Sequence, residues 1–305
     1  MSFCSLLTSP PDMLHLVLGI HRLLIRGVVQ LASDKFGSKL NDLASGLKEV
    51  GFTRMSVKIT ALLNTCDSKL TTIANVCSHI APNGNEGRLL EMRVGKLFEV
   101  LFYDTESTSH IKGRKRAKPI IFAYCLLAKI SDFFMTKKAT LAQLDNASIL
   151  ISKLKATLRD SIVEQELKNS VYFHVLEQDV VRYARFYIEN LGVNLGIFWA
   201  AVGEHCNYRV KREVMEHSNF SRDCCKQIIF RKQVRFFHVH DSCVLKSRTK
   251  FTCTSCGTPW HMKSNRMCPN HAKTGVFNYK TFSIDFPFTK EEESIMESLY
   301  ASRGS

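Results

Sequence analysis

Proline and glycine are scarce in this chain, with 7 and 15 among its 305 residues. With 45% hydrophobic and 23% charged residues, the composition is typical of a globular protein. The length suffices for one large domain or two ordinary ones, so burying a hydrophobic core presents no difficulty.

A long uninterrupted hydrophobic run is also missing. The most apolar early stretch, residues 13–31, is interrupted by four polar side chains: His15, His21, Arg22 and Arg26. A membrane-spanning helix needs about 18 consecutive apolar residues. No basic residue precedes the stretch, so it is also a poor signal peptide. We therefore expect an intracellular protein, in the nucleus or the cytoplasm, without a membrane partner.

The eleven cysteines are odd in number, which argues against a disulfide framework and for free thiols or metal ligands. The sequence contains no phosphate-binding glycine loop. It also lacks a Ser-His-Asp or paired-carboxylate signature. The sequence therefore shows none of these common signatures of a catalytic site.

Acidic residues are too few to balance the basic ones. The chain has 28 Asp and Glu against 42 Lys and Arg, which gives a net charge of +14. A surplus of this size is typical of proteins with a polyanionic partner: nucleic acid, an acidic protein or anionic lipid. The simpler alternative is a generally basic soluble protein with no such partner.

Hydrophobic residues recur at helical spacing over the first two hundred positions, which predicts a mainly α N-terminal domain over residues 1–203. A long pattern runs from Leu158 to Leu191, and Gly192 is the expected C-cap. Two stretches, 81–87 and 104–119, have the composition of a turn and of a polar loop. The other expected helices cover 12–31, 35–49, 55–65, 87–104, 119–136 and 140–156.

The loop expected at 104–119 ends in a basic cluster: Lys112, Arg114, Lys115, Arg116 and Lys118. Such a cluster on an exposed loop is typical of a nuclear import signal or a phosphate contact. An ordinary solvated loop has the same composition, so the sequence leaves all three interpretations open.

The character of the chain changes after residue 203. Two stretches, 224–240 and 276–288, are rich in β-formers and predict strands. Thr289, followed by acidic residues, is the expected cap of a short helix. We therefore expect a small α+β, zinc-stabilised domain over 204–288, followed by a short C-terminal helix and tail over 289–305.

A metal site is predicted by two ligand pairs with equal spacing. Cys253 and Cys256 form one pair, and Cys268 and His271 form the other after eleven intervening residues. A Cys-x-x-Cys turn brings two thiolates to one ion, and two such pairs complete the tetrahedron of a structural zinc. His261 lies between the pairs and is the alternative fourth ligand.

A second zinc ion is a further alternative, because more cysteines and histidines precede the quartet at irregular spacing. Small buried thiols and surface imidazoles would give the same pattern. These upstream residues are His205, Cys206, His217, Cys224, Cys225, His238, His240 and Cys243.

The zinc module adjoins a strongly basic segment. Residues 206–250 carry eleven Lys and Arg against four Asp and Glu, with aromatic residues interleaved. Cations neutralise phosphates and exposed aromatics stack on unpaired bases, so the pattern favours nucleic-acid binding, and single-stranded RNA over duplex DNA. The expected contacts are Arg231, Arg235, Lys246, Arg248 and Lys250.

Two other classes of function remain open. The density of Cys and His also fits a RING-like or treble-clef adaptor for protein partners, with the helical domain as a second binding surface. In addition, "SNRMCPNHAK" (264–273) resembles the Asn…Cys-Pro-x-His segment of HNH-type nucleases. That resemblance implies His240 as general base, with Asp241 and His271 holding a catalytic metal. It competes with the zinc quartet for His271.

Overall fold

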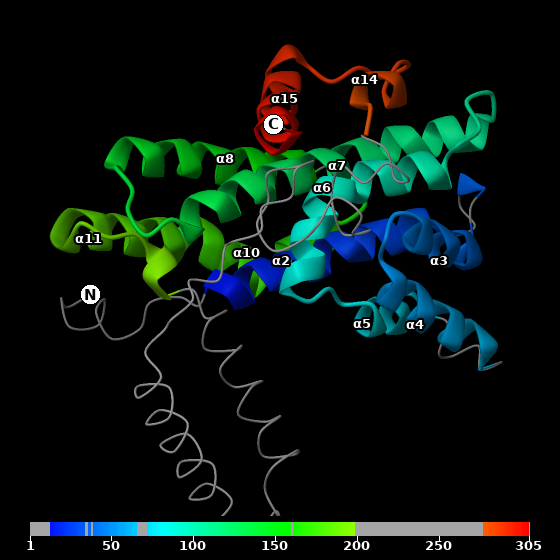
Figure 1. Ribbon diagram of the computed structural model, residues 1–305, viewed down its shortest axis with the longest axis horizontal. Helices are drawn as coiled ribbons and strands as arrows, with labels where there is room; N and C mark the ends of the chain where they lie inside the picture. Colours follow the sequence, from blue (N-terminus) through cyan, green and yellow to red (C-terminus); the bar gives the residue numbers. More distant parts are fainter. Residues whose placement is uncertain are drawn as a thin grey trace, which may run out of the picture. The chain divides into compact units, whose positions relative to one another are not determined.

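The computed structural model describes residues 13–33, 36–37, 39–65, 72–159, 161–198 and 277–304. All of these residues belong to one compact unit of the chain. Within those ranges the regular structure is helical and no strand occurs (Figure 1). The mainly α character expected for the N-terminal domain is therefore confirmed. The expected boundary at residue 203 lies outside the described residues and stays a prediction.

The longest helix, α7 (Thr108–Met135), lies at the centre of the described helices. It contacts α6 (Gly84–Leu101), α8 (Leu141–Arg159) and α2 (Met13–Leu31). Every residue of α7 between Ile120 and Ala128 is buried, because helices pack on several of its faces. The other elements are α3 (Leu40–Glu49), α4 (Thr53–Asn64), α5 (Ile73–His79), α9 (Glu164–Lys168), α10 (Val171–Val175), the π-turn η2 (Leu176–Val180), α11 (Val181–Leu191), the 3₁₀ turn η3 (Leu195–Phe198), α14 (Tyr279–Phe282) and α15 (Lys290–Gly304).

Helix α2 is long and apolar enough to cross a membrane by length and composition alone. In the structure, 72% of its most apolar window is buried. It packs against α5, α6, α7 and α10. A core helix of a folded domain has these same properties, so length and composition are weak evidence for a membrane span here.

The expected helix ends are partly right. Gly192 has φ +64° and ends α11, which confirms it as the C-cap. The pattern from Leu158 to Leu191 is not one helix, however, because serine hydroxyls interrupt it. Ser161 Oγ donates to the Leu158 carbonyl at 2.7 Å, and Ser170 Oγ accepts the Phe173 N–H at 3.3 Å.

The turn expected over residues 81–87 is shorter than predicted, because α6 begins inside it at Gly84. Asn83 Oδ1 accepts the Glu86 N–H at 2.9 Å, and Glu86 Oε2 accepts the Asn83 N–H at 3.0 Å. This reciprocal capping box satisfies backbone groups that a helix start otherwise leaves open. The composition indicated the turn correctly, but its second half is helical.

The strand predicted for 276–288 is wrong over its described part. Residues 277–288 form the short helix α14 and turns, with Phe277, Phe282 and Phe288 buried. The rings pack edge to face, with Phe277 and Phe282 centroids 5.6 Å apart, in place of a strand pairing. The aromatic alternation thus reflects packing onto the helices and not a pleat.

The terminal helix is confirmed as predicted. Thr289 Oγ1 accepts the Glu292 N–H at 3.2 Å, and Glu292 Oε2 accepts the Thr289 N–H at 2.7 Å. Helix α15 packs on α7, and Glu291 pairs with Lys153 of α8. The segment 277–304 therefore belongs to the helical unit.

A glycine on α6 makes room for this segment. A Cβ built on Gly95 would lie 2.4 Å from the Phe277 ring, so Gly95→Ala is expected to displace that ring and destabilise the protein by about 1–3 kcal/mol. Hydrogen exchange should rise over 277–304. Gly84→Ala in the same helix is the control, because its Cβ meets only Leu14 at 3.6 Å. Equal behaviour of the two variants would contradict this account of the packing.

Candidate anion-binding cleft on helix α7

Most of the predicted site residues lie outside the described part of the chain. These are the zinc quartet Cys253, Cys256, Cys268 and His271, the five nucleic-acid contacts between Arg231 and Lys250, the nuclease residues, and the upstream Cys and His set. They stay predictions. Among the described residues, no group of three or more Cys, His, Asp or Glu side chains is arranged to hold a metal ion.

The basic cluster at 112–118 is described, and the loop expected there is wrong. Helix α7 begins at Thr108 and continues through Pro119, so only a short turn before it is non-helical. Asp104 holds that turn by accepting the N–H groups of Glu106 and Ser107 at 2.9 and 3.1 Å. These two N–H groups lower the pKa of the Asp104 carboxyl. The cluster is therefore on a helix face, which fixes the direction of each side chain.

Two cations of the cluster have structural partners. Arg114 is buried, and its guanidinium donates to the carbonyls of Phe102 and Tyr103 at 2.8 and 3.2 Å, at the C-terminal end of α6. Lys118 Nζ donates to the Pro287 carbonyl at 2.8 Å and lies 4.8 Å from the Phe288 ring centroid. The interpretation as an import signal is thereby weakened, because these two side chains are engaged within the fold.

The other three cations, Lys112, Lys115 and Arg116, are exposed. They line a cavity of about 730 Å³ together with Phe36, Pro119, Ser161 and Ile162. None of the three cations has an ion-pair partner among the residues that the structure describes. We call this cavity the α7 cleft.

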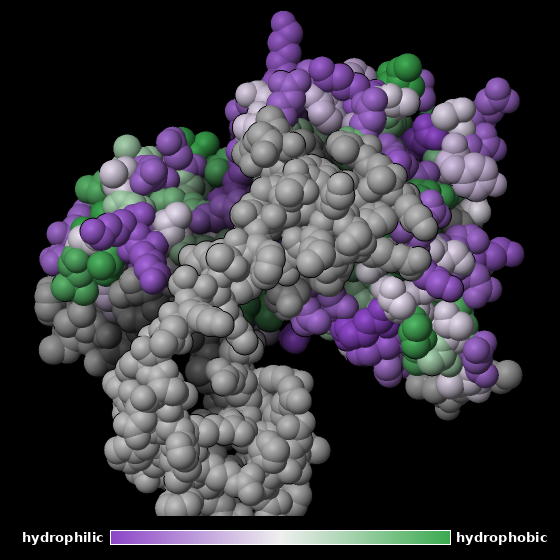
Figure 2. All heavy atoms as spheres, in the orientation of Figure 1, coloured by the Kyte–Doolittle hydropathy of each residue, from purple (hydrophilic) through white to green (hydrophobic). Residues whose placement is uncertain are grey.

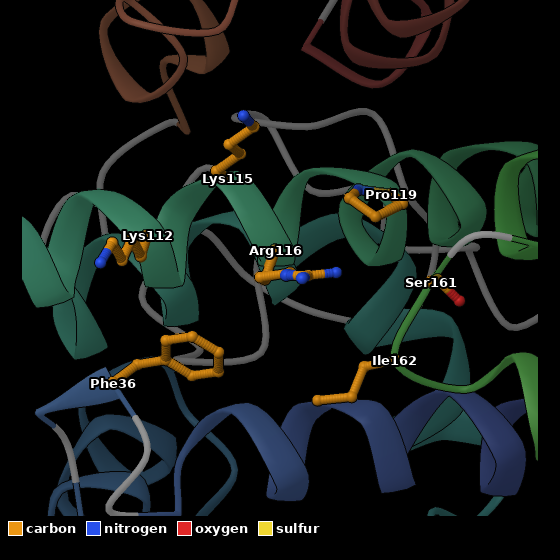
Figure 3. Close-up of a pocket in the computed structure, with 7 residues that line it drawn as sticks. All are labelled: Phe36, Lys112, Lys115, Arg116, Pro119, Ser161 and Ile162. Carbon is orange, nitrogen blue, oxygen red and sulfur yellow. The ribbon is translucent and has the colours of Figure 1, made fainter.

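Figure 3 shows the Arg116 side chain between Phe36 on one side and Ser161 and Ile162 on the other. Lys112 precedes Arg116 by one helical turn, so both side chains start on the same side of α7, and in Figure 3 their charged ends point in opposite directions along the helix. Lys115 also lines the cleft, but its amine in this view extends from the opposite side of α7 to Phe36. The cleft thus combines a cationic face with an apolar wall.

The two walls opposite α7 are held by local interactions. Gly37 has φ +81°, and a Cβ there would lie 2.9 Å from Ser109 Oγ, so the turn after Phe36 sits directly against the start of α7. On the other wall, Ser161 Oγ accepts the Val163 N–H at 3.3 Å while donating to Leu158. Because that hydroxyl is already engaged, a bound anion would be met by the cations of α7.

Elsewhere in the described unit, the ionisable groups with close contacts serve the fold. His21 Nε2 lies 3.1 Å from Glu91 Oε1 in the core, both nearly inaccessible to solvent, with the Tyr124 ring 5.7 Å from the imidazole. Burial also raises the pKa of the Cys77 thiol to about 11, which leaves little thiolate at neutral pH. Neither arrangement offers an accessible nucleophile.

The exposed hydrophobic side chains of the described unit are a weaker indication of a binding surface than the cations of the α7 cleft. In the space-filling view, hydrophilic residues cover most of the described surface that faces the reader, and hydrophobic ones lie in small separate groups (Figure 2). Single exposed apolar side chains of this kind are usual on globular proteins. The most exposed large ones lie on different elements and include Val57, Tyr103, Ile149, Val171 and Ile284.

The sequence predicted the cations of the α7 cleft as a basic cluster, but it did not predict the apolar residues that face them. Phe36 and Ile162 come from turns far apart in the sequence, and nothing in either turn marks it as a wall of a cavity. The recurrence of 112, 116 and 119 at helical spacing is the signal that could have placed those residues on one face.

Comparison with known proteins adds no identification. No family model matches the chain, and neither a curated protein nor a solved structure matches it. The chemistry of the residues themselves therefore has to indicate the function.

Proposed function

We propose that the protein binds nucleic acid, with single-stranded RNA favoured over duplex DNA. The observation that carries this proposal is the group of cations Lys112, Lys115 and Arg116 on α7, which are exposed and carry no ion pair within the described ranges. Cations that are free of acidic partners are available to neutralise phosphates and release counterions.

The comparison with other cations of the helical unit supports this assignment. Many of them are engaged across helices, as in the pairs of Lys155 with Glu177 at 2.6 Å and of Arg185 with Asp145 at 2.7 Å. Such pairs already neutralise their charge locally. The three cations of the α7 cleft are instead concentrated within a little more than one helical turn.

The proposal includes the C-terminal region. A zinc ion bound by Cys253, Cys256, Cys268 and His271 would stabilise residues 204–276. In that region Arg231, Arg235, Lys246, Arg248 and Lys250 would provide a second set of phosphate contacts. The net charge of +14 is the common basis of both sets.

The salt dependence of binding to a single-stranded RNA tests the proposal. Lys112→Gln/Arg116→Gln is expected to weaken binding and to reduce the slope of log K against log salt by about 0.7 for each phosphate that is no longer neutralised. Arg231→Gln/Arg235→Gln should act in the same way. Fluorescence anisotropy at several salt concentrations measures both effects.

Lys138→Gln is the matched control. Lys138 is exposed and follows the far end of α7, about 30 Å along the helix from Arg116 at 1.5 Å per residue. Affinity that is unchanged in both double variants would refute nucleic-acid binding at these residues and favour the adaptor alternative. Metal-dependent cleavage of the RNA that His240→Ala abolishes would favour the nuclease alternative.

A further inference from the structure

We propose that the α7 cleft holds one nucleotide unit, with its phosphate on Lys112 and Arg116 and its base against Phe36. The chemistry is that of a nucleoside monophosphate, either free or as a unit of a single strand. The second source, a unit of a strand, rests on the proposed function above.

The size and walls of the cleft fit a ligand with a flat apolar part. Its volume of about 730 Å³ lies within the range of roughly 300–1,000 Å³ that is usual for small-molecule sites. Phe36 is half-buried, so one part of its ring is covered while the rest remains accessible. Pro119 and Ile162 complete the apolar wall. Any of the nucleobases can stack on such a ring, because every base has a flat aromatic face.

The charges of the cleft fit a phosphate. Lys112 and Arg116 are four residues apart on the helix, which places their Cβ atoms about 6 Å apart on one face. An arginine fork can hold two phosphate oxygens at once, and a lysine adds a point charge beside it. None of the described residues that line the cleft is acidic, so no side chain among those residues repels an anion.

The position of Lys115 separates a free nucleotide from a strand. Its amine extends from the side of α7 opposite to Phe36 and Ile162 (Figure 3). A nucleotide seated between Phe36 and Arg116 would not need it. A strand that continues over α7 would place its next phosphate near this amine.

Binding of small ligands to the full-length protein tests the inference by calorimetry. AMP is expected to bind at least about tenfold more tightly than adenosine or inorganic phosphate, because only AMP uses both the apolar wall and the cations. Phe36→Leu should weaken AMP binding about tenfold, as removal of one aromatic stacking partner does. Phe36→Tyr should retain it, since the ring remains. Arg116→Gln should weaken it as strongly, and Lys138→Gln should leave it unchanged.

Two outcomes would overturn the inference: AMP binding no tighter than inorganic phosphate, or AMP binding insensitive to Phe36→Leu in a variant whose circular dichroism is that of the parent. Lys115→Gln then separates the two ligand sources. A fall in RNA affinity with unchanged AMP affinity supports a strand in the cleft. AMP binding without any RNA binding would refute the proposed function and leave the nucleotide site standing. RNA binding that is unchanged by Phe36→Leu and by Arg116→Gln would refute the nucleotide site but not the proposed function.

Discussion

Cys253→Ser is expected to remove one zinc ion per chain and to unfold the metal-dependent part of residues 204–276. Thiolates are the ligands that hold a structural zinc, and a small metal-organised domain commonly folds only with its ion bound. Apparent zinc-binding free energies in such domains are about 10–16 kcal/mol, far more than the substitution of a single thiol elsewhere would change. RNA binding through Arg231 and Arg235 should disappear together with the metal.

Elemental analysis of the purified protein measures the zinc content, and hydrogen exchange over 204–276 reports the folding of that region. Cys77→Ser is the control, because Cys77 lies on α5 in the helical unit and should leave the zinc content unchanged. A chain that keeps both its zinc and its protection from exchange after Cys253→Ser would show that the ligand assignment is wrong. Comparing His271→Ala with His261→Ala identifies the fourth ligand.

Glu91→Met is expected to lower the free energy of unfolding by about 1–3 kcal/mol, the cost of leaving a buried polar group without its partner. Glu91 and His21 are a buried pair, and removal of one partner leaves the other polar in an apolar core. The imidazole has no second hydrogen bond to replace the lost one, since its Nδ1 has no partner among the described residues. The nearby Tyr124 hydroxyl has none among them either. Gly87 brings α6 so close to the ring, 2.8 Å from a built Cβ to His21 Cδ2, that the imidazole cannot easily turn away.

The double variant His21→Leu/Glu91→Met separates the pair from the packing. Replacing both polar groups by apolar ones of similar volume should restore most of the stability. Urea denaturation followed by circular dichroism measures the midpoint of each variant. Asp145→Asn is the control, because its pair with Arg185 is half exposed and is worth about 1 kcal/mol or less. A single Glu91→Met variant as stable as this control would contradict the assigned role of the pair.

Hydrophobic periodicity predicted most of the long helices, but it indicated neither α5 nor the first half of α7. It located α2 and α8 closely, and the hydroxyl of Thr289 followed by acidic residues predicted the start of α15. These features depend on residues near in sequence, where spacing and capping decide the conformation. Local signals of this kind can be interpreted without the rest of the chain.

The N-terminal half of α7 escapes prediction for a physical reason. Its cations suggest a loop, but the inner face has Gly113 and Ala117, whose small side chains let the helix approach its neighbours. A Cβ on Gly113 would lie 2.6 Å from the Phe102 ring. Arg114 can be buried because two carbonyls at the end of α6 accept hydrogen bonds from its guanidinium. These hydrogen bonds form only when α6 and α7 pack together. Composition alone could not show it.

The strand expected at 276–288 failed for a related reason. Alternating aromatics predict a strand when one face is buried, but here the partners are helices. Phe288 lies 6.5 Å from the Phe122 ring on α7, and Phe277 fits against Gly95 on α6. Those partners are distant in sequence, so the same residues that suggested a pleat are accounted for by helix packing.

The return of the chain to the helical unit has a consequence for binding. Phe198 and Phe277 both belong to the helical unit, and Phe277 is buried against α6. The basic residues of the sequence between them are therefore joined covalently to this unit on both sides. A nucleic acid held on the α7 cleft would meet the basic residues of this closed segment at a local concentration set by chain length and not by the bulk solution. Two individually weak sites would then bind one nucleic acid more tightly than either site does. Removal of either site would lower the overall affinity to that of the remaining site.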